Sequence, residues 1–584
     1  MTLIPPIDTS ITSQQQLLSC ARGETPCDLV LKNGQVVNTF TGEILAQDVG
    51  IFQGRIAGIG QYSGHGEVDL KGRYICPGFI EGHIHIESSM LSPARFARAV
   101  VPRGTTTVIC DPHEIANVLG MEGVRYMLES GKNLPLDIFS MIPSCVPATD
   151  METNGATLNQ EDIDALLDEP GVPGLAEMMN FPGTIGGAPA ILAKLQTALD
   201  RGFVIDGHAP GVTGKQLQAY CGAGISSDHE CTTMEEAREK LRAGMYIFIR
   251  EGSTARNLEA LLPLITPESA QWFLLVSDDR HPDDLMAQGH LDHILRRAVA
   301  LGLDPITALK MVTINPTVRF NLKMRGALAP GYLADAVVLD DLNDFIVHQV
   351  YKEGRLVAQD GRTIDQHFSP IQMVKDVSPT GSIHIDWSAV DFRIPARSGK
   401  IRVIECVAEQ IITGMAELAP TILGNEAVAD PARDLLKIAV IERHLASGNM
   451  TNGFVRGFGL RAGAMASTVA HDSHNLIVVG TNDELMLTAA RLVADSGGGI
   501  ALLNHGKSIV LPLPVGGLMS TDSLQEVTET LFKLKHFAEE LKIKIRNPFM
   551  LLSFLALPVI PSLKITDKGL VDVIAFQTVP LWVV

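Results

Sequence analysis

Residues 77–85 read Pro-Gly-Phe-Ile-Glu-Gly-His-Ile-His, an apolar run that ends in two histidines separated by one residue. In a β-strand, residues i and i+2 lie on the same face, so His83 and His85 can point at one centre. This is the geometry of a pair of metal ligands. Two histidines on a half-buried strand can also be satisfied by backbone hydrogen bonds, because so short a motif often occurs by chance. The rest of the chain has to decide between these two interpretations.

From residue 77 onward, short apolar runs alternate with helical stretches such as 161–167, 191–199 and 234–243. The candidate strands are 80–85, 106–110, 138–142, 174–178, 203–206, 224–227, 246–250 and 272–276. A domain of roughly 250 residues with this alternation is typical of a (β/α)8 barrel, a fold of the α/β class. We therefore predict a barrel over residues 77–324.

Polar side chains gather where these predicted strands end. Such barrels carry their chemistry at the C-terminal ends of the strands. The candidate ligands are His83 and His85 after the first strand, Glu177 at the fourth, His208 after the fifth, Asp228 and His229 after the sixth, and Asp278 and Asp279 after the eighth. Imidazole and carboxylate groups that meet at one rim favour a metal site over isolated structural histidines.

The segments on both sides of the barrel predict further domains. Short β-rich runs before residue 77 and after residue 325 indicate a small antiparallel β domain, a β-sandwich formed from residues 1–76 and 325–377. Residues 1–25 read as a polar leader with little periodicity. A Ser/Pro/Thr/Gly run over 378–381 is typical of a linker, and residues 382–584 predict an additional C-terminal α+β domain with helices over 482–494 and 525–541.

Composition limits the kinds of partner. The net charge of −19, without a cluster of Lys and Arg, argues against nucleic acid and against an anionic membrane, so we expect a small-molecule substrate. The eight cysteines are dispersed and the N-terminus lacks a signal-peptide pattern, which fits a cytoplasmic location. The apolar stretch 549–563 is too short for a membrane span and contains two prolines, so we expect buried core.

One polar cluster of the C-terminal region needs an explanation. Residues 471–475 read His-Asp-Ser-His-Asn between two apolar runs. Such residues are common in solvated turns. The alternative is that the cluster faces the mouth of the barrel and takes part in enclosing a substrate.

These motifs together resemble the amidohydrolase superfamily. The resemblance rests on residues 77–85, on the histidines after strands five and six, on the Asp after strand eight, and on the later Asn315-Pro316 and 331–337 segments. Many members carry a carbamylated lysine after strand four, where this chain has Glu177. Over nearly its full length the chain resembles the bacterial adenine deaminase family, through residues 81–89, 110–117, 176–180, 206–211, 227–230 and 471–475.

The resemblance implies hydrolytic deamination of adenine to hypoxanthine and ammonia in purine salvage. It implies two divalent metal ions, Mn or Fe in most such proteins, with Zn possible for the same donor types. One ion would be held by His83, His85 and Asp278, the second by His208 and His229, and Glu177 would bridge them. The zinc-deaminase signature His-x-Glu with Pro-Cys-x-x-Cys is absent, so deamination would have to rest on the barrel site.

The residues also suggest catalytic roles. Asp278 could accept a proton from the attacking hydroxide and return it to the leaving amine, and we count His229 with the catalytic residues as well. Glu114 could exchange a hydrogen bond with a purine ring nitrogen, or it could support other side chains. The candidate substrate-binding residues are Glu114, Ser88, His471 and His474.

Two other functions remain open at this point. N-acetylglucosamine-6-phosphate deacetylase also uses a barrel with a Glu in place of the bridging lysine, but a phosphate needs basic residues, and the strand ends offer mainly Arg250 and Arg280. A non-catalytic scaffold is the other alternative, and the complete ligand set argues against it. We expect a homodimer or a higher homo-oligomer.

Overall fold

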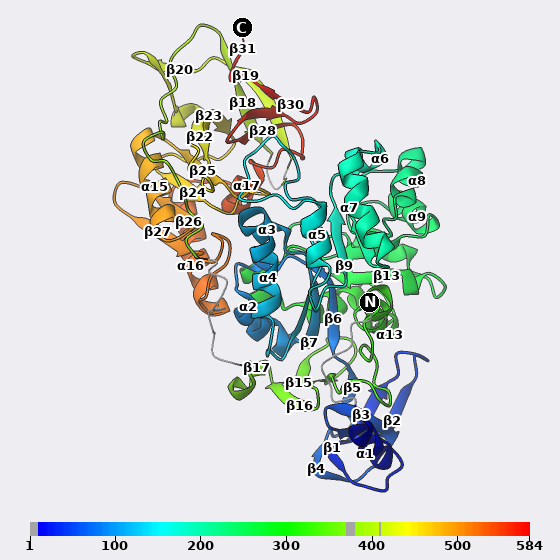
Figure 1. Ribbon diagram of the computed structural model, residues 1–584. Helices are drawn as coiled ribbons and strands as arrows, with labels where there is room; N and C mark the ends of the chain where they lie inside the picture. The colour runs from blue at the N-terminus through cyan, green and yellow to red at the C-terminus, as the bar shows by residue number, and fades with distance from the viewer. Residues whose placement is uncertain (1–9, 369–379, 408–409, 411, 584) are drawn as a thin grey trace.

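The computed structural model describes residues 10–368, 380–407, 410 and 412–583. Figure 1 shows three parts: a small β sheet at the bottom, a central group of strands and helices, and a C-terminal part coloured yellow to red at the upper left. The central and C-terminal parts lie against each other, so residues far apart in sequence can form one site.

Eight short strands form the middle of the central part. They are β6 (Phe79–Ile84), β7 (Thr105–Cys110), β8 (Asp137–Ser140), β9 (Gly174–Met178), β10 (Val204–Gly207), β11 (Ser227–Asp228), β12 (Tyr246–Arg250) and β13 (Phe273–Val276). All pairs among them are parallel, in the three sheets β6-β7-β8, β9-β10 and β11-β12-β13. We call these strands the central strands.

Backbone contacts also join the three sheets. The amide of Asp278 donates to the carbonyl of His83 at 3.1 Å, which brings the end of β13 beside β6. Ile142, just after β8, pairs with Leu175 of β9 in the same way. Because parallel strands share one direction, the carboxyl ends of the central strands lie on one side, which we call the strand-end face.

Helices follow the strands in the predicted alternation. Three of the predicted stretches are present within two residues, as α5 (Gln160–Leu166), α7 (Pro189–Asp200) and α9 (Met234–Arg242). The other helices of this part are α2 (Pro93–Val100), α3 (His113–Leu119), α4 (Met121–Ser130), α6 (Phe181–Ile185), α8 (Gly214–Gly222), α10 (Leu258–Leu261), α11 (Pro282–Gln288), α12 (Leu291–Ala300), α13 (Pro305–Met311) and α14 (Ile314–Arg319). The β strands between them are almost wholly buried, as packing on both faces requires.

The small sheet takes strands from both flanks of the central part. β14 (Ala336–Leu339) pairs antiparallel with β5 (Tyr74–Pro77), so the chain returns to the N-terminal strands after the last central helix. The sheet has nine strands in the described residues. Its other strands are β1 (Cys27–Val37), β2 (Ile44–Phe52), β3 (Arg55–Gly60), β4 (Gly64–Asp69), β15 (Val347–Lys352), β16 (Arg355–Gln359) and β17 (Arg362–Thr363).

Two expectations for this flank are wrong. The sheet is mixed and not purely antiparallel, because β4 and β5 both pair parallel with β1; turn motifs in the sequence specify only the local hairpins. The predicted polar leader contains a helix, α1 (Ile11–Ala21). Ser10 caps it by accepting from the amide of Ser13, and it buries Leu17 and Cys20. Its apolar stripe is too narrow to stand out as a periodic pattern.

The C-terminal part contains a second sheet, which has nine strands in the described residues. Its order is β19 (Thr413–Leu418), β18 (Lys400–Cys406), β23 (Met450–Arg456), β22 (Leu436–Ile441), β25 (Leu476–Gly480), β24 (Ala464–Ser467), β26 (Gly499–Leu503) and β27 (Ser508–Pro512), with β31 (Trp582–Val583) beside β18. The two predicted helices are confirmed as α15 (Asp483–Asp495) and α16 (Leu524–Glu540), and the stretch predicted as buried core begins with α17 (Pro548–Phe554).

The C-terminal part lies over the strand-end face. The amide of Ser520 donates to the carbonyl of Met90 at 2.8 Å, and the amide of Ser92 donates back to the carbonyl of Ser520 at 2.9 Å. Lys535 of α16 forms an ion pair of 2.6 Å with Asp283 of α11. Among the described residues, the helices are all too short or too polar to cross a membrane.

Candidate metal centre

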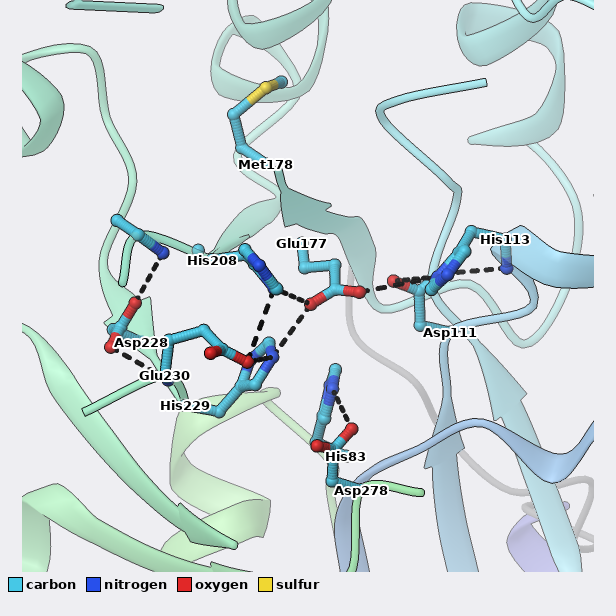
Figure 2. Close-up of polar contacts among 12 residues, drawn as sticks. His83, Asp111, His113, Glu177, Met178, His208, Asp228, His229, Glu230 and Asp278 are labelled. Carbon is cyan, nitrogen blue, oxygen red and sulfur yellow. Dashed lines mark hydrogen bonds and ion pairs between the residues drawn. The ribbon is translucent and has the colours of Figure 1, made fainter. Parts of the chain in front are cut away.

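The predicted ligands come together on the strand-end face. Figure 2 shows side chains from several central strands pointing toward Glu177, which lies in β9. His83 belongs to β6, and His85 follows that strand. His208 and His229 follow β10 and β11, and Asp278 follows β13. All are buried except His208, whose side chain is 26% exposed.

Glu177 contacts imidazoles with both of its oxygens. Its Oε2 lies 3.0 Å from His208 Nδ1 and 2.9 Å from His229 Nε2. Its Oε1 lies 3.8 Å from His85 Nε2 and 3.4 Å from His113 Nδ1. A carboxylate that faces two groups of nitrogen donors in this way is placed to bridge two cations.

A second group of donors surrounds Asp278. Its Oδ1 lies 3.2 Å from His85 Nε2 and 3.6 Å from His83 Nε2. The rings of His83 and His229 are stacked, with centroids 4.3 Å apart, so this group is continuous with the one around Glu177. The structure therefore brings all six sequence-predicted ligands together.

The donor set fits divalent metal ions. The ligand atoms of His83, His229 and Asp278 lie within 4.8 Å of one another, as do those of Glu177, His208 and His229. His83 Nε2 is buried and has no hydrogen-bond partner among the described residues. A buried polar nitrogen without a partner is costly, and a cation between these donors would satisfy it. Imidazole and carboxylate donors suit Zn, Mn and Fe.

Sequence reasoning missed His113. It begins α3, and its Nδ1 lies 3.5 Å from Asp111 Oδ2 as well as 3.4 Å from Glu177 Oε1. The atoms of His85, Asp111, His113 and Glu177 form another candidate cation group. The signal was present, because His113 closely follows β7, but the second strand was considered only for Glu114.

Arg250 and Glu230 are the other residues that sequence reasoning did not place. Arg250 Nη1 lies 3.1 Å from Asp278 Oδ2, and its Nη2 donates to Glu230 Oε2 at 2.9 Å. The guanidinium thus holds one oxygen of Asp278 and leaves the other facing the histidines. Glu230 Oε1 in turn lies 3.5 Å from His229 Nε2.

Carboxylates dominate the electrostatics of this cluster. Burial would lower the pKa of His208, but Glu230 and Glu177 raise it to about 9. Burial likewise opposes a charge on His113, but Asp111 raises its pKa to about 10. The cluster therefore attracts positive charge, whether it arrives as protons or as metal ions.

Two buried carboxyl groups of the site have pKa values shifted in opposite directions. Burial would raise the pKa of Asp278, but the nearby imidazoles of His83 and His85, whose Nε2 atoms lie 3.6 and 3.2 Å from Oδ1, hold it well below its ordinary value. Burial raises the pKa of Glu114 to about 8, and the nearby carboxyl of Glu87 adds to the shift. At neutral pH, Asp278 is therefore ionised and Glu114 is protonated.

The predicted substrate residues lie beside the candidate metal ligands. Ser88 Oγ donates to Asp279 Oδ1 at 2.5 Å and lies 3.3 Å from Glu114 Oε1. His471 Nδ1 lies 3.6 Å from the same Glu114 oxygen, and the ring of His474 lies 5.4 Å behind that of His471. The cluster 471–475 thus faces the strand-end face.

The solvated-turn interpretation of this cluster is wrong. Asp472, Ser473, His474 and Asn475 are buried, and the side chain of His471 is only 12% exposed. The His471 ring stacks on Phe554 of α17 with centroids 4.7 Å apart. A cavity of about 30 Å³ remains between Ser88, His471 and α17, which is room for one or two water molecules.

The fold and the arrangement of these candidate ligands are those of an amidohydrolase. The Amidohydrolase family matches residues 74–357, and the Adenine deaminase C-terminal domain matches residues 410–577. The chain is 50% identical over 570 residues to the adenine deaminase of Desulfatibacillum aliphaticivorans, with 97% of this chain and 99% of that protein covered. It is 46% identical over 576 residues to adenine deaminase 2 of Carboxydothermus hydrogenoformans, again with 97% and 99% covered. This chain belongs to the adenine deaminase family.

Proposed function

We propose that this protein hydrolyses adenine to hypoxanthine and ammonia in purine salvage. The observation that carries the proposal is the group of imidazoles and carboxylates around Glu177, at the strand-end face of a chain that belongs to the adenine deaminase family. Replacing an amino group on an aromatic ring by oxygen requires a strong nucleophile and a proton for the leaving amine. The side chains described above are of the types that can support both.

We also propose the division of the chain into three domains. The central strands would form a closed (β/α)8 barrel over residues 77–324, which the bond between Asp278 and His83 supports. The small β-sandwich domain would comprise 1–76 and 325–377, which the pairing of β5 with β14 supports. The C-terminal α+β domain would comprise 382–584. A cytoplasmic location and a homo-oligomeric state remain predictions.

Two divalent ions would be held by the cluster, with Mn or Fe as the metal and Zn as an alternative. His83, His85 and Asp278 would hold one, His208 and His229 the other, and Glu177 would bridge them. When bound, such ions lower the pKa of water to about 7 and so provide hydroxide at neutral pH. His113 would support the bridge through its contact with Glu177.

Asp278 and Glu114 would have different roles, one in proton transfer and one in hydrogen bonding to the base. Asp278 is ionised and can take a proton from the attacking water and return it to the leaving amine, with His229 beside it. Glu114 is protonated at neutral pH and can donate a hydrogen bond to a ring nitrogen of the base. Opposite pKa shifts in neighbouring groups are how an active site assigns acid and base roles.

The cover of the site favours a small flat substrate. Ser88, His471 and His474 would contact the base, and the cavity that Ser88 and His471 line beside α17 is small. We therefore expect the free base to be accepted and the nucleoside to be excluded, because ribose would need room that this cover does not leave. Turnover of adenosine at a rate comparable to that of adenine would contradict this expectation.

The test of the proposed function is direct. The protein, purified with added manganese, is incubated with adenine while hypoxanthine and ammonia are measured. A sample of the same preparation treated with a chelator is the control and should be inactive.

Deacetylation of N-acetylglucosamine 6-phosphate is assayed as the competing activity. We expect none, because Arg250 is engaged by Glu230 and Asp278, and Arg280 by Gly289 and Gln288.

A further inference from the structure

Arg443 is a completely buried arginine whose contacts are neutral oxygens. It follows β22 and has no exposed surface. Its Nη1 donates to the carbonyl and hydroxyl oxygens of Ser382 at 3.1 and 3.0 Å, its Nη2 donates to the carbonyl of Gly516 at 2.9 Å, and its Nε donates to the carbonyl of His474. The described residues provide no carboxylate within ion-pair distance of this guanidinium.

These acceptors belong to segments that touch the strand-end face. The loop of residues 471–475 carries His471, which lies beside Glu114. The loop of residues 515–520 carries Ser520, which exchanges backbone hydrogen bonds with Met90 and Ser92. We call these two loops the C-terminal wall. One guanidinium therefore joins both loops of the wall to each other and to Ser382, where the C-terminal part begins.

The chain is shaped to receive this guanidinium. Gly517 lies directly over it, with a φ of +75°. A Cβ at this position would meet both Nη1 and Nη2 at 2.9 Å, which real Cβ contacts do not allow. Only glycine permits both this backbone conformation and this close approach.

Burying an arginine without a carboxylate partner is energetically unfavourable. Burial lowers the pKa of Arg443 to about 9, so the group still carries its charge at neutral pH. Transferring a cation from water to the protein interior is strongly unfavourable, and carbonyl dipoles compensate for this only in part. A hydrophobic residue could fill the space without this penalty, but it could not fix the carbonyls of His474 and Gly516 relative to each other.

We propose that Arg443 is a positioning residue that sets the C-terminal wall against the strand-end face, and that it thereby determines how tightly the substrate is held. The inference rests on the proposed function, in which His471 and His474 contact the base. Arg443 itself touches no substrate. Its effect passes through the backbone of His474 and of the 515–520 loop.

The test compares Arg443→Met with Lys437→Met. Lys437 is a matched control: it is a buried cation of β22, the strand that Arg443 follows, and is 2% exposed, but it pairs with Asp483 of α15. In Arg443→Met we expect KM for adenine to rise roughly tenfold to a hundredfold, with kcat little changed and metal content intact. Lys437→Met should keep the wild-type KM. An unchanged KM in a folded Arg443→Met protein would overturn the proposal.

Two further measurements keep the proposal testable if Arg443→Met does not fold. Gly517→Ala places a Cβ against the guanidinium while Arg443 itself is kept. This variant should raise KM for adenine as Arg443→Met does, and a wild-type KM would contradict the proposal. Arg443→Ala assayed with millimolar methylguanidinium should recover part of the lost kcat/KM. A loss that is purely structural would not respond to this cation, and the absence of any rescue would count against the proposal.

Failure of the proposed function would be recognised separately. If the wild-type protein does not deaminate adenine, the positioning role is read from hydrogen exchange. The amide protons of Ser92 and Ser520, which hold the wall on the strand-end face, should exchange faster in Arg443→Met than in Lys437→Met. Equal protection in the two variants would overturn the inference independently of any substrate.

Discussion

The histidines of the candidate metal cluster and those of the C-terminal wall differ in charge preference, although burial disfavours a positive charge in both groups. In the cluster, burial would lower the pKa of His208, yet Glu230 and Glu177 raise it to about 9. In the wall, burial lowers the pKa of His471 and holds that of His474 well below its ordinary value. Histidines in the cluster are therefore surrounded by negative charge that favours a cation, whereas histidines in the wall are kept neutral.

This difference suits a reaction on an uncharged base. A metal centre needs accumulated negative charge, whereas a flat aromatic ring needs a surface that can form hydrogen bonds without a strong field. The strand-end face supplies the carboxylates of Glu177 and Asp278. The wall supplies neutral imidazoles held by the backbone and by a guanidinium placed out of reach of the substrate. Each variant below changes one side and leaves the other in place.

The largest effect should come from Asp278→Asn. An amide of nearly the same shape can still coordinate, but it cannot take a proton from the attacking water and return it to nitrogen. General acid and base groups contribute about 10²–10⁴-fold, so kcat should fall by at least the smaller factor. Steady-state kinetics with adenine measure this loss.

Metal loss has to be separated from proton transfer in that variant. Metal stoichiometry is therefore measured on the same preparation that is used for kinetics. A well-metallated Asp278→Asn enzyme with near wild-type kcat would remove Asp278 from the proton path and make Glu114 the next candidate.

The next effect concerns His113, which contacts Glu177 on the strand-end face without being one of the six predicted ligands. Changing a group that orients metal ligands typically costs about 10–100-fold in metal affinity or activity. His113→Asn should show such a loss, because it removes the contact with Glu177 Oε1. His293→Asn, on α12 and away from the cluster, is the control. If both variants bind metal as tightly as the wild type, His113 has no supporting role.

A smaller effect is expected on the wall side. His471→Ala and His474→Ala should each lower kcat/KM for adenine by roughly tenfold, the value of about one hydrogen bond in a buried site. Metal content should stay at the wild-type level, in contrast to His113→Asn. Unchanged kinetics in both variants would mean that the wall only covers the site and does not contact the base.

The two sides also differ in how far the sequence could predict them. Each predicted ligand lies in an apolar run or just after one, and parallel strands bring their carboxyl ends to one side, so the positions of His83, His85 and Glu177 were informative. His113 lies in the first turn of a helix, where a histidine looks ordinary. Arg443 left no signal, because its acceptors are backbone and hydroxyl oxygens that any sequence can offer.

The wall itself could be predicted only as a polar cluster. The sequence of residues 471–475 does not indicate which surface of the protein they face. Their position depends on long-range contacts, such as the bond from Asn475 Nδ2 to the carbonyl of Thr153 at 2.8 Å. Likewise, the helix α1 is held by burial of Leu17 and Cys20 against Cys27 and Val30 of β1 and Ala57 of β3, which the pattern within the helix does not reveal.

The smallest effect at neutral pH should come from Glu114→Gln, the one change made where the two sides meet. Burial and the carboxyl of Glu87 raise the pKa of Glu114 to about 8, so the protonated form is the one present at pH 7. If that form donates a hydrogen bond to the base, kcat/KM should fall as the pH rises through 8, because the carboxylate has no proton to give. Glutamine keeps a donor at every pH. The variant should therefore resemble the wild type near pH 7 and lack the decline of kcat/KM at alkaline pH. A profile of kcat/KM against pH, from about pH 6 to about pH 10, measures this difference.

Glu152→Gln is the matched control. The pKa of Glu152 is also raised by burial, but its hydrogen-bond partner is Ser473, so the alkaline decline should persist in this variant. An alkaline decline that survives in Glu114→Gln would assign the titrating group to another residue and leave Glu114 with a supporting role.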